Sequence, residues 1–253
     1  LQKVVLAQAL DLEFDAPTDV ASVLTDLEIT YPDCYRFAFR GGDRPEGPHP
    51  DPRRYFVGAS PERLVAKSGQ DVSTEALAGT VDRGSGPEDD AAKETQLRTD
   101  PKIEAEHTMV VEEIDSQLDR LGAAVTTGDR TVRKLETVQH LQTSLTATVR
   151  PQTHVLDVVE ALHPTPAVGG RPPDAAMAVI RERDPVERGW YAAPVGWFDA
   201  AGDGTFAVGI RSGVIEGERA TLFAGNGIVA DSDPELEWAE VTSKFRPIRS
   251  ALG

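Results

Sequence analysis

Short β-type segments joined by connections of hairpin length limit the fold of this chain most. Residues 205–212 alternate between large apolar side chains and small or polar ones, and residues 220–224 return after a turn at 216–218. Such a short connection pairs two strands antiparallel, because a parallel pair needs a crossover of a dozen or more residues. Similar runs occupy 3–10, 31–40, 54–59 and 63–67. The pattern therefore predicts antiparallel sheets rather than a parallel βαβ array.

Three helices are predicted among these strands. Apolar residues recur every four positions from Val110 to Leu118, and Gly122 follows as a stop signal. Residues 174–183 form a second helix, and Asp233-Pro234 opens a last one, because Asp caps a helix and proline is tolerated at its first position. Stretches rich in Gly, Pro or acidic residues at 40–53, 84–99 and 164–173 are predicted to be loops. We therefore expect an α+β fold in a single domain over 1–253.

Charge and cysteine content exclude several classes of partner and site. The 253 residues carry a formal net charge of −16, which repels phosphate backbones and anionic lipid surfaces. Cys34 is the single cysteine, so the sequence allows neither an intrachain disulfide nor a zinc site made of cysteines. It has no apolar run of 18 residues and no signal-peptide pattern. We expect a soluble, cytoplasmic monomer without nucleic-acid or membrane partners, and its acidic surface is either ordinary or adapted to high salt.

Two of the predicted helices carry acidic residues next to their apolar faces. Counting back by fours from Val110 places Glu106 on that face, as a first-turn acid favoured by the helix dipole or as a paired or metal-binding group. In the last helix Glu237, Glu240 and Lys244 share one stripe. Glu240 and Lys244 have the spacing of a surface ion pair, and the alternative is that Glu240 joins Glu106 at a hard cation. Oxygen ligands without a His or Cys cluster favour Mg²⁺ over zinc.

Four further positions are unusual for their place in the pattern. Lys3 begins an apolar strand, either as an edge lysine that reaches solvent or as a buried base. Glu62 follows a rigid Ser-Pro corner, as a turn carboxylate or a positioned acid. Arg211 ends a strand face of small residues, which leaves room for a bidentate ligand carboxylate. Gly225 is either a bulge or a point where a ligand approaches the backbone, and the half-match of 225–230 to a dinucleotide fingerprint follows a hairpin, which argues against it.

Nine segments in order along the chain carry a resemblance to a known family. They are KVVLAQAL (3–10), GASPERLV (58–65), ALAGTVDRG (76–84), EAEHTMVVEEI (104–114), VQHLQTSLTATV (138–149), LHPTPAVGG (162–170), PVGWFD (194–199), FAVGIRSG (206–213) and FAGNGIVADSDPELEWAEVTSKFRP (223–247). Together they resemble the chorismate-utilising enzymes, which include isochorismate synthase, salicylate synthase, anthranilate synthase component I and aminodeoxychorismate synthase. The resemblance implies two stacked, mainly antiparallel sheets flanked by helices. Members usually carry a further N-terminal region, so we expect one before residue 1.

Two positions favour isochorismate synthase within this family. Lys3 matches the lysine of the water-using and salicylate-forming members, where ammonia-using members typically have Gln. Ala167 matches the isochorismate synthase loop, where salicylate synthases tend to have Thr. The resemblance implies conversion of chorismate to isochorismate for menaquinone or a salicylate-type siderophore. The alternatives are salicylate synthase, which also eliminates pyruvate, and a chorismate-binding unit without turnover.

The resemblance also implies a role for each site residue. Lys3 is the base that activates water for addition at C2, and Glu62 is the acid that protonates the leaving C4 oxygen, each worth about 10²–10⁴ in rate. Mg²⁺ is the implied cofactor, and it neutralises the ring carboxylate of the substrate. Glu106 and Glu240 hold the ion, and Glu237 is an outer acid. The implied substrate contacts are Gly79, Thr80, His140, Ala167, Arg211, Gly225 and Lys244.

Two positions depart from the family pattern. Gln8 stands where an Arg is usual after KVVLA, and Ile103 stands where an acid is common three residues before the metal-binding Glu. Glu104 is offset by one from that acid, so we expect its side chain to point elsewhere.

Overall fold

The computed structural model describes residues 1–41, 54–136 and 138–253, whose contacts divide into two compact units. Unit 1 consists of Leu1–Pro61, Gly170–Ala193 and Val208–Gly253, and unit 2 of Glu62–Gly169 and Pro194–Ala207. Each unit is built around one six-stranded sheet. Most of the loop predicted over 40–53 lies outside the described residues. The single domain predicted over 1–253 stays a prediction.

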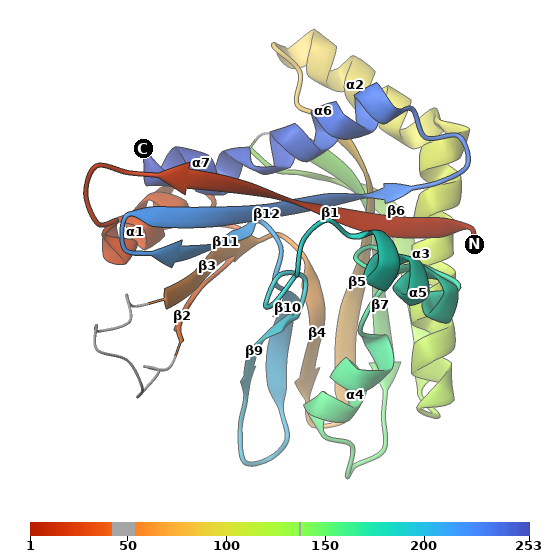
Figure 1. Ribbon diagram of the computed structural model, residues 1–253. Helices are drawn as coiled ribbons and strands as arrows, with labels where there is room; N and C mark the ends of the chain where they lie inside the picture. The colour runs from red at the N-terminus through yellow and green to blue at the C-terminus, as the bar shows by residue number, and fades with distance from the viewer. Residues whose placement is uncertain (42–53, 137) are drawn as a thin grey trace. The chain divides into compact units, whose positions relative to one another are not determined.

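Unit 1 joins strands from the two ends of the chain. Its strands are β1 (Lys3–Glu13), β2 (Tyr35–Arg40), β3 (Arg54–Ser60), β8 (Gly170–Arg171), β11 (Ser212–Glu216) and β12 (Arg219–Ile228), and its helices are α1 (Val20–Thr30), α5 (Pro173–Arg183), α6 (Pro234–Lys244) and α7 (Arg246–Leu252). The sheet has the order β2-β3-β11-β12-β1-β8, and its neighbouring strands are antiparallel. β1 pairs with β12 from Val4↔Ile228 to Glu13↔Arg219 (Figure 1). The hairpin between β11 and β12 turns at Gly217, which has a positive φ of 64° and confirms the predicted turn.

Helices of unit 1 bury one face of this sheet. Leu222 and Ala224 of β12 pack in one apolar cluster with Leu27 of α1, Val241 of α6 and Ile248 of α7. Side chains alternate between the two faces of a strand, so odd-numbered residues of β12 lie on the other face. A second cluster packs even-numbered residues of β1 and β12 against α5; it comprises Val4, Leu6, Ile228, Ala176, Met177, Val179 and Ile180. Because Val4 and Leu6 face α5 and side chains alternate along β1, the side chain of Lys3 lies on the opposite face of the sheet.

Unit 2 has a sheet of the order β6-β7-β5-β4-β10-β9 with helices packed on it. The elements are β4 (Arg63–Ser68), β5 (Asp71–Asp82), β6 (Ala124–Lys134), β7 (Val138–Thr148), β9 (Pro194–Phe198), β10 (Gly204–Val208), α2 (Pro87–Thr99), α3 (Pro101–Arg120) and α4 (Val155–Leu162). Two sheets with antiparallel pairs and flanking helices confirm the predicted α+β class. Within the described ranges, no helix has both the length and the apolar character needed to cross a membrane.

The long helix α3 follows its sequence signals closely. The Asp100 side chain caps it by accepting from the amides of Lys102 and Ile103 at 2.8 and 3.2 Å. The predicted stripe is buried in the core of unit 2, since Val110, Ile114 and Leu118 are 1%, 1% and 0% exposed. Gly122 ends the helix with a φ of +71°. Burial of this stripe fixes which residues of the first turns face β5.

The loop predicted over 84–99 is wrong, because α2 occupies 87–99. Its first turn follows Gly86 and Pro87 and carries Glu88, Asp89 and Asp90, which the positive end of the helix dipole favours. The Asp90 carboxylate binds Arg83 at 2.7 Å and Lys134 at 2.8 Å, and both interactions hold the pKa of Asp90 well below its usual range. Polar composition suggested a loop, but the helix is docked by ion pairs and by a fully buried Leu97.

Three other predicted element boundaries need correction. The strand predicted over 205–212 ends at Val208 as β10, and β11 starts at Ser212. The strand predicted over 31–40 begins only at Tyr35, and the loop predicted over 164–173 contains the two-residue strand β8. In each case the chain leaves or joins a ladder at positions that depend on long-range pairing rather than on side-chain alternation.

Candidate functional site

Lys3 lies at the start of β1 with its side chain enclosed. The residue is 2% exposed, which excludes an edge lysine that reaches solvent. Its backbone pairs with Arg171 of β8, and Gly170 packs so closely on the Lys3 carbonyl that a Cβ at position 170 would overlap it. On the other edge, β1 pairs with β12 from Val4 onward. The fold thus places a buried ammonium group at one fixed point of the sheet.

Helix α6 is tied to β12 through three of the predicted site residues. Asn226 Nδ2 donates to the carbonyl of Glu237 at 3.0 Å and also to the Glu237 carboxylate. Lys244 Nζ donates to the carbonyl of Gly225 at 2.9 Å. The same ammonium pairs with Glu240 Oε1 at 2.7 Å, which confirms the predicted i, i+4 ion pair. Within unit 1, Lys244 therefore joins Glu240 to Gly225, and Asn226, the next residue of β12, holds Glu237.

Arg211 was predicted to end a strand face. It lies instead in the turn between β10 and β11. Its φ of +50° is rare for a residue with a side chain, and its carbonyl accepts from the Ala59 amide at 3.1 Å. Burial lowers the pKa of the Arg211 guanidinium, while Tyr191 and Glu240 act in the opposite direction. Arginine stays charged at neutral pH even so, which leaves a desolvated cation suited to an anionic ligand.

In unit 2, a β-bulge brings Gly79, Thr80 and His140 together. The register of β5 against β7 shifts between Ala78 and Thr80, and Gly79 has a φ of +75°. Thr80 Oγ1 lies 3.1 Å from His140 Nδ1, and that nitrogen lies 3.2 Å from the Gly79 carbonyl. Ile103 of α3 packs on Gly79, where a Cβ would overlap it. The glycine is required both for the bulge and for this close approach.

Glu106 lies one helical turn after Ile103 and is partly buried on α3. Its neighbour Glu104 pairs with Arg130 at 2.7 Å, so the expectation that Glu104 points elsewhere is confirmed. His107 Nε2 lies 2.8 Å from Thr143 Oγ1, and burial lowers the pKa of this imidazole. The side chain of His107 thereby joins α3 to β7 beside Glu106.

Glu62 and Ala167 occupy two further positions of unit 2. Glu62 is 6% exposed and directly precedes β4, so it is a buried carboxyl group rather than a solvated turn acid. Ala167 lies in a turn closed by the amides of Val168 and Gly169, which donate to the Thr165 carbonyl at 3.1 and 2.9 Å. These contacts place each residue within unit 2, and their roles toward a substrate stay predictions.

The acidic residues suit a hard cation by the chemistry of their donors. Across the described residues, no group of three or more His, Cys, Asp and Glu side chains is gathered to hold a metal ion. The predicted ligands are carboxylates, with Glu106 on α3 of unit 2 and Glu237 and Glu240 one turn apart on α6 of unit 1. Carboxylate oxygens fit Mg²⁺, which is commonly bound through one or two of them together with substrate oxygens and water.

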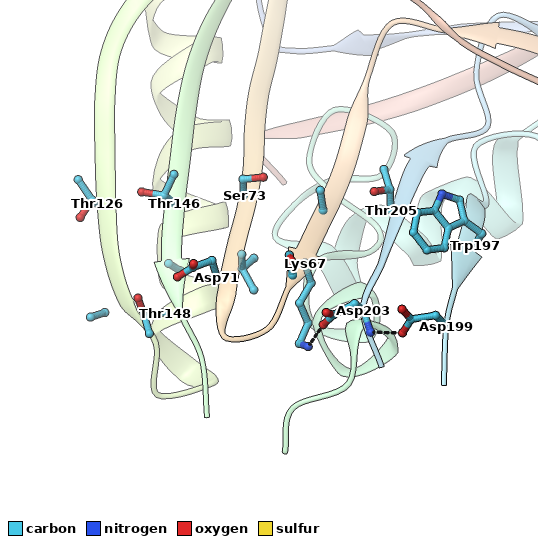
Figure 2. A pocket seen from close by; sticks show the side chains of 15 residues that line it. Lys67, Asp71, Ser73, Thr126, Thr146, Thr148, Trp197, Asp199, Asp203 and Thr205 are labelled. Carbon is cyan, nitrogen blue, oxygen red and sulfur yellow. Dashed lines mark hydrogen bonds and ion pairs between the residues drawn. The ribbon is translucent and has the colours of Figure 1, made fainter. Parts of the chain in front are cut away.

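A cavity of about 610 Å³ in unit 2 involves other residues (Figure 2). Its lining includes Lys67, Ser73, Thr146, Trp197 and Asp203, and Lys67 Nζ pairs with Asp203 Oδ1 at 2.7 Å. Its lining residues include none of the predicted site residues. We therefore do not assign the predicted chemistry to this cavity.

The family is decided by comparison with known proteins. The sequence profile of the family described as chorismate binding enzyme matches residues 1–253, which is the whole chain. The chain belongs to the chorismate-binding enzyme family. Isochorismate synthase MenF of Bacillus subtilis is 44% identical over 252 residues, which cover 99% of this chain and 51% of that protein.

Two solved structures of family members match the fold closely. DhbC from Bacillus anthracis superimposes with a TM-score of 0.95 at 33% identity, covering 100% of this chain and 67% of that one. MenF, the menaquinone-specific isochorismate synthase from Escherichia coli, gives a TM-score of 0.89 at 33% identity, covering 100% and 56%. The chain thus has the chorismate-binding fold and spans about half the length of the curated Bacillus subtilis relative.

Sequence reasoning missed residues that hold the site residues of this family member in place. Asn226 holds Glu237, and Tyr191 stacks on Phe223 with ring centroids 5.5 Å apart. A Cβ at Gly225 would come 3.1 Å from the Tyr191 hydroxyl. The sequence signal for Asn226 is a polar side chain in an otherwise apolar strand, within the half-match to a dinucleotide fingerprint at 225–230. Nothing local to Tyr191 indicated its position.

Proposed function

We propose that this chain is the catalytic part of an Mg²⁺-dependent isochorismate synthase. The observation that carries the proposal is 44% identity, over 99% of the chain, to an isochorismate synthase. Two positions support this choice within the family. Lys3 matches the water-using and salicylate-forming members rather than the ammonia-using ones, and Ala167 matches isochorismate synthases rather than salicylate synthases. The proposal includes a cytoplasmic monomer that takes chorismate as a small-molecule substrate, and the isochorismate would supply menaquinone or a siderophore.

The reaction exchanges one hydroxyl for another across the ring. Water adds at C2 and the C4 hydroxyl departs as water, so one proton must be removed and one supplied. In the proposal Lys3 removes the proton from the attacking water, and Glu62 gives a proton to the C4 oxygen. Lys3 and Glu62 are 2% and 6% exposed, and this burial supports the roles because an enclosed side chain is held in place for proton transfer within hydrogen-bond reach of the substrate.

Substrate carboxylates are assigned to the cationic side chains of unit 1. Arg211 presents a guanidinium that can bind a carboxylate through two parallel hydrogen bonds. The Lys244 ammonium is held in place by Glu240 and by the Gly225 carbonyl. In the proposal this ammonium binds a carboxylate of the substrate beside α6. In unit 2, Gly79, Thr80, His140 and Ala167 are proposed to contact the substrate.

Glu106, Glu237 and Glu240 are proposed to hold Mg²⁺. When bound, the ion would neutralise the ring carboxylate of chorismate and anchor it. The Lys244 ammonium orients the Glu240 carboxylate, and Asn226 orients that of Glu237. Such hydrogen-bonded carboxylates reach a ligand in one conformation, which limits the entropy lost on binding.

Product analysis tests the proposal. The purified chain is incubated with chorismate with and without Mg²⁺, and the products are separated by chromatography. Isochorismate formed only with Mg²⁺ supports the proposal. Salicylate and pyruvate as main products replace it with salicylate synthase, and saturable chorismate binding without any product replaces it with a binding unit.

A further inference from the structure

In the described part of the chain, no long strand covers one edge of the N-terminal half of β1. Alternate residues of an antiparallel strand direct their backbone groups to opposite edges. β12 covers one edge from Val4 to Glu13, whereas β8 pairs with the other edge only at Lys3 and Val4. Beyond β8, the carbonyl of Val5 and the amide of Ala7 need other partners, because unsatisfied buried backbone groups are costly.

Two side chains that follow α5 supply those partners. Asp184 Oδ1 accepts from the Ala7 amide at 2.8 Å, and Arg188 Nη2 donates to the Val5 carbonyl at 2.7 Å. Arg188 Nε also donates to Asp184 Oδ2 at 2.6 Å. Beyond the end of β8, the Asp184 and Arg188 side chains therefore bond the β1 backbone groups that a longer neighbouring strand would bond.

The pair is buried enough for its geometry to matter. The side chains of Asp184 and Arg188 are 6% and 17% exposed. An ion pair with so little solvent is expensive unless its remaining polar atoms are satisfied. Both carboxylate oxygens of Asp184 accept a hydrogen bond, and the planar fork of Arg188 spans Asp184 and the backbone of β1. This arrangement admits little variation in the position of Val5 and Ala7.

The same segment continues to the turn that carries Arg211. The amide of Tyr191 donates to the Arg188 carbonyl at 2.8 Å. Ala192 donates to the Gly209 carbonyl at 2.9 Å, and Gly209 returns a bond to Ala193 at 2.8 Å. Residues 184–193 thus contact both β1 and the turn before Arg211.

We propose that Asp184 and Arg188 are positioning residues that hold Lys3 in register for the reaction. Lys3 lies two residues before Val5 on β1, so a shift of the clamped backbone moves the lysine side chain. A misplacement of about 1 Å in a reacting group can cost about 10² in rate. This inference rests on the proposed function, in which Lys3 is the base.

Asp184→Ala tests the pair in the full chain. It removes the acceptor for the Ala7 amide and the partner of Arg188, so kcat for isochorismate formation should fall by about 10- to 100-fold while KM for chorismate stays within about threefold. Amide hydrogen exchange in the peptide that covers 1–13 should become faster. Asp184→Asn keeps an oxygen for the Ala7 amide but loses the acceptor for Arg188 Nε, so it should recover only part of the lost rate. Arg188→Lys serves if Asp184→Ala does not fold, because lysine keeps the charge but lacks the planar fork.

A control variant removes a more exposed ion pair elsewhere in unit 1, with side chains 59% and 28% exposed. Arg54→Gln breaks the Arg54–Glu216 pair at 2.8 Å between β3 and β11 and should leave both kcat and exchange in β1 unchanged. The proposal is overturned if folded Asp184→Ala or Arg188→Lys keeps the wild-type kcat, or if kcat falls with no change in exchange of β1. A wild-type chain that forms no isochorismate would refute the proposed function instead, and the exchange measurement would still test whether the pair holds β1.

Discussion

Lys3 and Glu240 differ in how the fold holds their charged groups. Lys3 is 2% exposed and owes its position to the backbone of β1, which is bonded on both edges. The Glu240 side chain is 34% exposed and owes its orientation to Lys244. Replacing Lys3 therefore removes a buried side chain from a backbone that is held in place, whereas replacing Glu240 changes a partly exposed side chain that pairs with Lys244.

Lys3→Ala should abolish hydration of chorismate while leaving chorismate binding largely intact. Loss of a general base lowers the rate by about 10²–10⁴. The measurements are kcat by product formation and chorismate affinity by calorimetry. Lys67→Ala is the matched control, because Lys67 is 5% exposed and pairs with Asp203 away from the predicted site residues. Turnover of Lys3→Ala at the wild-type rate would remove this lysine from the chemistry.

Glu240→Gln should lose Mg²⁺-dependent activity without unfolding. Glutamine keeps an oxygen that can accept from Lys244 but carries no charge for the cation, so Mg²⁺ affinity should fall by at least about tenfold. Calorimetric titration with Mg²⁺ and the thermal midpoint are both measured. Glu235→Gln, at an exposed acid in the first turn of the same helix, should leave Mg²⁺ affinity unchanged. Wild-type affinity in Glu240→Gln would exclude a ligand role.

At the scale of elements, local chemistry was enough to predict some boundaries and not others. The cap at Asp233 and the stop at Gly122 act within a single turn, so they were visible in the sequence. α2 was missed because its docking depends on Lys134, 44 residues from Asp90. The contact of Asp184 with Ala7 spans 177 residues and has no local signal. The site residues were predicted through family resemblance, and the groups that position them emerge only from such long-range contacts.

The loop after α4 begins with a histidine that makes stability depend on pH. Burial lowers the pKa of His163 to about 4 from an ordinary value of 6.5. The unfolded chain then binds more protons than the folded chain between those values, so stability is present above pH 6.5 and is lost as the pH falls toward 4. The contribution lost between pH 7 and pH 5 is about 2 kcal/mol.

Urea unfolding of wild type and His163→Gln at pH 7 and pH 5 measures this loss. The variant has no imidazole at 163 and should lose less stability on acidification than the wild type, by about the amount given above. His107 is present in both proteins, so its own lowered pKa cancels in the comparison. Equal losses in the two proteins would show that His163 titrates alike in the folded and unfolded states.

At the scale of the whole molecule, the excess of negative charge opposes compactness. The chain has 42 acidic and 26 basic residues, so ion pairing leaves at least 16 negative charges unbalanced. Several pairs are exposed, such as Arg219–Glu13 with side chains 76% and 75% exposed, and each contributes little. Repulsion among the unbalanced acidic side chains should therefore outweigh the attraction within the exposed ion pairs, and salt screens both interactions.

Added salt should accordingly stabilise this protein. The Debye length falls from about 30 Å at 0.01 M to about 10 Å at 0.1 M and about 3 Å at 1 M, so repulsion between distant charges is removed first. The thermal midpoint should rise by about 2–4 °C for each kcal/mol of repulsion relieved, with most of the rise below 0.1 M. Sucrose at matched osmolality is the control, because it strengthens apolar burial without screening charge. A midpoint that rises only above 0.1 M, in parallel with sucrose, would assign the effect to solvent exclusion, and a midpoint that falls would mean that the exposed ion pairs outweigh the net charge.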